Sequence, residues 1–211
     1  MNTNQNQVSW GFWLVWVLAS TLGFGAGAVL GIGIPLGFVP AGAAFPIFFG
    51  AIFGAIGSLA QWMIIRRQLP EAGLWVPFSA LAFMLAMATM AGMFSRVAPD
   101  FNPSFILAGI YGLLGGFLQG LILQKQGVPI GWWIAASILG GLLGPTVTGS
   151  AVTAVETEQA WQIGKMFFLI WFRLGAPIGL GLGITTGAAL VWFLRNSKIG
   201  SRDEVAMQET R

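Results

Sequence analysis

The chain has 211 residues, of which 56% are hydrophobic and only 8% are charged, with a formal net charge of +3. Soluble domains carry about 25% charged residues, so this composition favours a membrane protein. The chain has neither cysteine nor histidine, which excludes disulfides, removes the commonest general base and leads us to expect no metal site or cofactor. Its basic residues flank apolar runs and form no single patch, so nucleic acid is not an expected partner.

Six apolar runs are each long enough to cross a bilayer, which takes about 20 helical residues. Backbone groups in lipid must bond within their own segment, so each run is predicted to be a helix. In chain order the runs cover about residues 9–33, 43–65, 73–94, 103–123, 131–151 and 174–194. They predict an all-α, polytopic membrane protein with one transmembrane domain at 1–195 and a polar cytoplasmic tail at 196–211.

The segment before the last span departs from this pattern. A helix continued back from the last span to Trp161 would be too long for a bilayer, even when tilted. Polar residues at helical spacing precede an apolar stretch, which predicts a short amphipathic helix at about 157–172, lying at the non-cytoplasmic interface. Gly175 and Pro177 then permit a turn into the last span.

Basic residues near the ends of the spans predict the orientation. One face receives Arg66, Arg67, Lys125, Arg195, Lys198, Arg202 and Arg211, and the other receives Arg96, Lys165 and Arg173. The positive-inside rule therefore places both termini in the cytoplasm, in the cell (inner) membrane. Tryptophan is enriched at membrane interfaces, so Trp75 and Trp133, which begin two spans, are expected at the cytoplasmic interface.

An internal repeat relates two stretches of the chain at an offset of 58 residues, without a gap. The matched pairs include Gly54 with Gly112, Gln61 with Gln119, Trp75 with Trp133, and Ser79 with Ser137. Weaker similarity links the start of the first span and the end of the last span to the same pattern. A fixed period indicates a repeated structural unit, so the six spans are predicted to form three parallel two-helix hairpins.

Glycines recur every four residues along several spans, which places them on one helix face. Small residues on such a face let helix backbones approach closely within a membrane. The positions predicted to pack helices in this way are Gly23, Gly27, Gly31, Gly50, Gly54, Gly112, Gly116, Gly120, Gly179, Gly183 and Gly187. The spacing allows the facing helix to belong to the same chain or to another subunit, and packing within the chain is favoured.

Three polar side chains in apolar surroundings are candidate ligand-binding residues. Gln61 and Gln119 hold the same place in two hairpins, and a buried amide in lipid must find hydrogen-bond partners. Their alternative role is an inter-helix hydrogen bond that sets the packing register. Arg173 interrupts an apolar run, and its alternative role is to extend towards the interface and pair with Glu156 or Glu158.

The run from Gly57 to Gln68, with Gln61-Trp62 and Arg66-Arg67, followed by Ala72-Gly73-Leu74-Trp75, resembles a hairpin that recurs in small multi-pass membrane proteins of cyanobacterial type. The second copy departs from it, since Gly120 replaces the tryptophan. The resemblance covers the second to fifth spans and implies a six-span membrane protein without an assigned activity. It also implies a thylakoid membrane as an alternative location.

The seven acidic residues lie in predicted loops or in the tail, where burial does not tune a carboxyl group for catalysis. We therefore expect a non-enzymatic membrane protein, acting as an accessory, assembly or interaction subunit that packs through its glycine-rich helix faces. Its expected partners are the lipid bilayer and other membrane proteins or further copies of the chain. The alternative is a small-solute transporter or substrate-binding membrane component, and a third hypothesis is pigment or lipid binding.

Overall fold

The computed structural model describes residues 10–39, 42, 44–69, 72–93, 103–152 and 164–196. All regular elements within these ranges are helical. Their bounds are α1 Trp10–Leu36, α2 Ala44–Ile65, a short 3-10 helix η1 Ala72–Leu74, α3 Trp75–Met93, α4 Pro103–Gln124, α5 Ile130–Val152 and α6 Gly164–Asn196. Five helices are long and apolar enough to cross a membrane, and the sixth, α5, contributes a shorter apolar stretch at Ile130–Gly144. The all-α, membrane-type class predicted from the sequence is thus confirmed.

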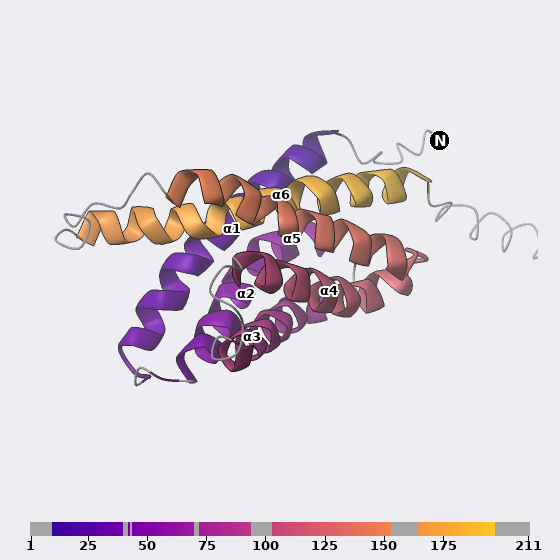
Figure 1. Cartoon of the computed structure of the whole chain (residues 1–211). Coiled ribbons are helices and arrows are strands. Elements are labelled where there is room, and N and C mark those ends of the chain that lie inside the picture. Colours follow the sequence, from indigo (N-terminus) through magenta and orange to yellow (C-terminus); the bar gives the residue numbers. More distant parts are fainter. Residues whose placement is uncertain are drawn as a thin grey trace, which may run out of the picture.

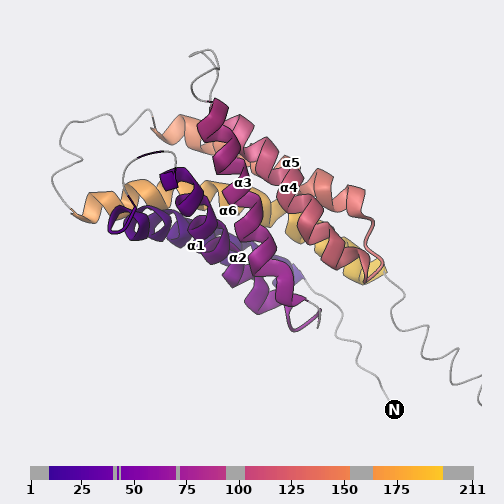
Figure 2. The ribbon, with the colours of Figure 1, turned by 90° about the horizontal axis from the view of Figure 1, so that it is seen from below.

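The six long helices pack in a closed order. Each one contacts its two neighbours along the chain, and α6 returns to contact α1. Figures 1 and 2 show α6 running beside both α1 and α5, although α1 is at the opposite end of the sequence. Side chains that point inward from all six helices therefore meet in one common core.

The connection between α4 and α5 is short because two residues are suited to their places in it. Gly127 has a φ of 83°, a left-handed conformation that glycine adopts without steric cost. Its N–H donates to the carbonyl of Gln124 at 2.9 Å, and the next N–H, of Val128, donates to the carbonyl of Leu123 at 3.2 Å. These bonds satisfy carbonyl groups that the end of α4 would otherwise leave unpaired. Pro129 then immediately precedes α5, where a missing N–H costs nothing.

The outer surface of the bundle is strongly apolar. Leu14, Leu18 and Leu22 follow one another at four-residue steps along α1 and are 54%, 60% and 58% exposed. Soluble monomers seldom expose continuous apolar surface of this kind. A helix face of this composition is suited to lipid rather than to water.

The predicted separation between an interfacial helix at 157–172 and the last span is wrong within the described residues. Residues 164–196 form one continuous helix, α6, with Pro177 inside it, while 157–163 lie outside the described ranges. Gly175 does not make a turn. A Cβ atom there would overlap the carbonyl oxygen of Phe24 on α1, so this glycine lets the two helices approach closely.

The helix continues through Pro177 because its packing against α1 extends on both sides of that residue. Pro177 removes one backbone hydrogen bond, a loss that helices in membrane bundles tolerate when neighbouring groups surround the site. With 33 residues, α6 is about 50 Å long. It therefore tilts in a hydrocarbon core of about 30 Å or extends beyond it.

Candidate functional site

Three buried tryptophans lie at one end of the bundle, each followed four residues later by a buried serine. The pairs are Trp16 and Ser20 on α1, Trp75 and Ser79 on α3, and Trp133 and Ser137 on α5. A four-residue step places both members on the same helix face, one turn apart. Each of the three odd-numbered helices therefore presents the same polar pair to the core.

Gln119 on α4 joins two of these helices. Its Nε2 donates to Ser79 Oγ on α3 at 2.8 Å, and its Oε1 accepts from Trp133 Nε1 on α5 at 3.3 Å. The side chain is only 5% exposed. One amide thus ties α4 to the helices on both sides and satisfies a buried indole N–H.

Gln61 on α2 makes the same two bonds in the preceding part of the chain. Its Nε2 donates to Ser20 Oγ on α1 at 2.9 Å, and its Oε1 accepts from Trp75 Nε1 on α3 at 3.2 Å. It is 3% exposed. In both cases the amide donates to the serine of the preceding odd-numbered helix and accepts from the tryptophan of the following one.

Thr186 on α6 takes the corresponding place next to α1. Its Oγ1 accepts from Trp16 Nε1 at 3.1 Å, and its hydroxyl donates to the carbonyl oxygen of Leu182 one turn earlier. The shorter side chain makes no bond to Ser137 on α5, whose buried Oγ has no partner among the described residues. The hydrogen bonds that link neighbouring helices around the bundle therefore involve two glutamines and one threonine. One of the three serines, Ser137, is left unpaired among the described residues.

Aromatic rings fill the centre between these polar groups. The ring of Trp75 contacts that of Trp16 with centroids 5.9 Å apart and that of Trp133 with centroids 5.7 Å apart, both edge to face. A second cluster of Phe24, Phe53, Phe83 and Tyr111 is buried alongside it in the same core. The two clusters pack the interior of the described bundle with side chains next to the amides.

Trp75 and Trp133, which were expected at the cytoplasmic interface, point into the core of the bundle rather than outward. They are 0% and 1% exposed, whereas Trp10, Trp132 and Trp192 are 61%, 69% and 59% exposed. The indole N–H explains the difference, because a tryptophan can be buried once that donor has a partner. Here the two glutamines supply the partner.

The predicted packing glycines face helices of the same chain. Glycines of α1 contact α2, those of α2 contact α3, those of α4 contact α5, and those of α6 contact α1. The positions are, in that order, Gly23, Gly27 and Gly31; Gly50 and Gly54; Gly112, Gly116 and Gly120; and Gly179, Gly183 and Gly187. These faces are therefore occupied within the bundle and are not available to another subunit.

Arg173, the third candidate ligand-binding residue, is separate from the two glutamines. It is exposed on α6, 13 residues before Thr186, which is about 20 Å along a helix. Its suggested partners Glu156 and Glu158 lie outside the described residues. The structure thus brings Gln61 and Gln119 into one network through α3 and leaves Arg173 out of it.

Sequence reasoning overlooked Trp16, Ser20 and Thr186 as members of this network. The spacing Trp-x-x-x-Ser occurs in all three odd-numbered helices and could have identified the first two. Thr186 follows Gln119 by 67 residues instead of 58. The longer connection between α5 and α6 therefore hides it from a comparison at one fixed offset.

Comparison of the chain with family models, curated proteins and solved structures finds no match. The class of protein is therefore defined by the helices and their contacts alone. It is an all-α chain with several membrane-length helices and a core in which tryptophan, serine and glutamine side chains bond across helices.

Ser137→Ala and Ser79→Ala form a matched pair of variants that tests this network. Ser137→Ala removes a hydroxyl without a described partner, so we expect stability to rise or to change by less than about 0.5 kcal/mol. Ser79→Ala leaves the Nε2 of Gln119 without its acceptor and should cost about 1–3 kcal/mol. Unfolding in detergent by increasing SDS, followed by circular dichroism, measures both. Equal losses in the two variants would contradict the described network.

Proposed function

We propose that the chain is a non-enzymatic integral membrane protein that acts through its outer surface, as an accessory or assembly subunit for other membrane components. The observation that carries the proposal is the closed core. The glycine faces are used within the chain, and both buried amides are bonded to neighbouring helices. Recognition then takes place on the surface that faces lipid and neighbouring proteins.

The architecture that we propose is six spans in three parallel hairpins, α1–α2, α3–α4 and α5–α6. It is supported by the repeated bonding rule, in which each even-numbered helix accepts an indole N–H from the next odd-numbered helix. The rule includes the return from α6 to α1. A chain of unrelated helix pairs would have no physical reason to repeat it.

We further propose that both termini lie in the cytoplasm of a cell membrane, or of a thylakoid membrane if the chain is cyanobacterial. The proposal is supported by Arg66 and Arg67 after α2, Lys125 after α4 and Arg195 in the last turn of α6. Arg195 lies over the ring of Trp10 at 5.3 Å, which brings the start of α1 and the end of α6 to the same basic end of the bundle. Positive residues are enriched on the cytoplasmic side.

Photo-crosslinking in native membranes tests the role as a subunit. Phe48 and Phe53 lie on the same helix, α2, but are 50% and 3% exposed. With p-azidophenylalanine at position 48, we expect an adduct with a second membrane protein that also co-purifies in mild detergent. The same group at position 53 should give no intermolecular adduct. A free monomer without adducts from position 48, or from the exposed Phe117 on α4, would contradict the proposal.

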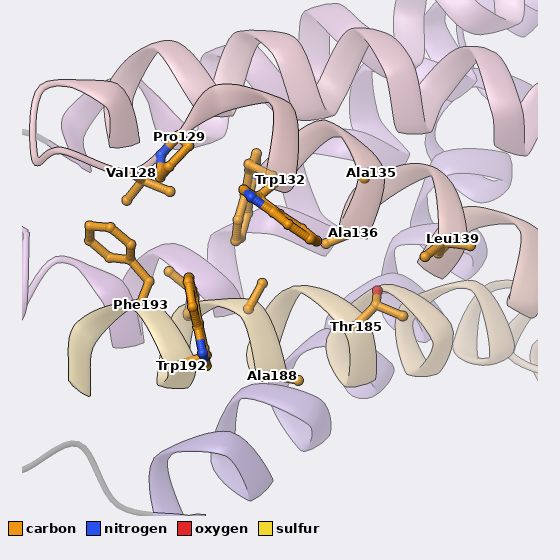
Figure 3. A pocket seen from close by; sticks show the side chains of 13 residues that line it. Val128, Pro129, Trp132, Ala135, Ala136, Leu139, Thr185, Ala188, Trp192 and Phe193 are labelled. Carbon is orange, nitrogen blue, oxygen red and sulfur yellow. The ribbon is translucent and has the colours of Figure 1, made fainter. Parts of the chain in front are cut away.

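A second candidate function, the binding of an apolar lipid or pigment, is favoured by one specific observation. A groove of about 590 Å³ opens between α5 and α6, with Trp132 and Trp192 on its walls. Figure 3 shows their rings, from α5 and α6 respectively, together with Phe193 and Val128 at one end of the groove. Ligand pockets of this size are common in proteins and are mainly apolar.

The transporter hypothesis has no corresponding support. It expects a ligand-sized polar cavity beside Gln61 and Gln119. Both amides are instead buried and bonded to serine and tryptophan, and neither lines the groove between α5 and α6. We therefore do not propose these glutamines as a substrate site.

A further inference from the structure

Each of the three helix pairs has a groove on its outer side, towards the basic end of the bundle. The volumes are about 500 Å³ between α1 and α2, about 290 Å³ between α3 and α4, and about 590 Å³ between α5 and α6. The residue just before the buried tryptophan of α1, α3 or α5 lines the groove in every pair, and in the second pair this residue ends η1. These residues are Val15, Leu74 and Trp132.

One equivalent position at or just after the end of each even-numbered helix carries a different residue type in the third groove. Six residues after Gln61, Gln119 and Thr186 come Arg67, Lys125 and Trp192 respectively. All three of these side chains line their own groove. Two grooves therefore combine apolar walls with a cation at the basic end, while the third has a tryptophan in its place.

We propose that the grooves between α1 and α2 and between α3 and α4 each bind an anionic phospholipid from the bilayer. An acyl chain lies against the apolar walls, and the phosphate is held by Arg67 in the first groove and by Lys125 in the second. The groove between α5 and α6 lacks the cation and does not select an anionic headgroup. The charge at this one repeated position therefore indicates which grooves bind an anionic lipid.

The chemistry of the lining residues fits this occupant. Arg67 and Lys125 are exposed and follow helices of membrane length, where long basic side chains reach the headgroup region while their stems lie on apolar surface. Basic pockets between transmembrane helices bind lipid headgroups, and each cation near an anionic surface contributes about 1 kcal/mol. Arginine can bind phosphate through two parallel hydrogen bonds, whereas lysine acts as a point charge. The groove with Arg67 should therefore bind more tightly.

This inference rests on the proposed outer-surface role, but it is tested on the purified chain without a partner protein. Native mass spectrometry of the detergent-solubilised chain would count bound phosphatidylglycerol and, separately, phosphatidylcholine with the same acyl chains. We expect two tightly retained molecules of phosphatidylglycerol per chain and weaker binding of phosphatidylcholine. Arg67→Gln and Lys125→Gln should each weaken the binding of phosphatidylglycerol by about fivefold.

Arg66→Gln is the matched control, because it removes the same charge from the neighbouring position. Arg66 lies over the ring of Trp62 at 4.7 Å and does not line the groove between α1 and α2. Its replacement should leave lipid binding nearly unchanged. Trp192→Lys places the missing cation in the third groove and should add a third retained phosphatidylglycerol. Gel filtration and circular dichroism of each variant establish that it is folded.

Three results would overturn the proposal. Equal weakening by Arg66→Gln and Arg67→Gln would show attraction to net charge rather than a groove site. Equal retention of the two lipids would show that the headgroup is not recognised. If soluble glycerol phosphate displaced bound phosphatidylglycerol as strongly as a lipid does, the grooves would be sites for free phosphate. If lipid binding fails while the adduct at position 48 persists, the subunit role stands without this inference. If the adduct at position 48 is lost while lipid binding persists, this inference stands and the subunit role is contradicted.

Discussion

Replacing Gln119 with leucine is expected to destabilise the bundle by about 2–4 kcal/mol. The change removes the donor to Ser79 Oγ and the acceptor for Trp133 Nε1 together. The indole N–H of Trp133 stays buried without a partner, and an unsatisfied buried donor costs about 1–3 kcal/mol. The hydrogen bonds between helices that are lost with it contribute about 0.6–2 kcal/mol each in membrane proteins.

Gln124→Leu is the control for this prediction, because Gln124 ends the same helix and is exposed. It should change stability by less than about 0.5 kcal/mol. Unfolding by SDS, followed by circular dichroism, compares the two variants under identical conditions. Similar losses in both would indicate that any glutamine-to-leucine change on α4 disturbs the bundle, and would remove the argument for a buried amide.

A double-mutant cycle separates the bond from the side chains that make it. Trp133→Phe removes the indole N–H but keeps an aromatic ring in the core. In the Trp133→Phe background, Gln119→Leu no longer leaves that donor unpaired, so its cost should fall by about 1–2 kcal/mol. Strict additivity of the two changes would contradict a direct bond between Gln119 and Trp133.

The sequence predicts where the helices lie along the chain and which polar residues are equivalent. It does not predict which face of each helix points into the core. The repeat at 58 residues places Gln61 and Gln119 at equivalent positions and leaves open whether they bind a ligand or a neighbouring helix. These helices are apolar almost all round, so no polar stripe shows which side faces lipid. Only the bonds observed to Trp75 and Trp133 establish that both tryptophans belong to the core.

The error at α6 has a different physical origin. Span length and the helix-breaking tendency of proline both favoured a turn near Gly175 and Pro177. Local preferences of this kind are overridden when a long face packs against another helix. Here Gly175, Gly179 and Gly183 all contact α1. The spacing of the glycines places them on one helix face but does not show which helix packs against that face.

The second large effect is expected from adding a single methyl group to one glycine of α4. In Gly112→Ala, the new Cβ would lie 2.6 Å from the Cα of Ile138 and 2.9 Å from its backbone nitrogen. Because those are main-chain atoms of α5, no side chain can rotate away and the helices must separate. Overpacking of this kind costs about 1–3 kcal/mol.

Gly109→Ala, one turn earlier on the same helix, makes the same chemical change in open space. Nothing lies within 4 Å of a Cβ at position 109, so the substitution should be neutral or should stabilise α4 by up to about 1 kcal/mol through helix propensity. The two variants thus have opposite expected signs although both are glycine-to-alanine changes on α4. Unfolding by SDS under one set of conditions compares them directly. Destabilisation by both would point to a general need for glycine along α4, whereas tolerance of alanine at 112 would mean that α4 and α5 do not pack as closely as described.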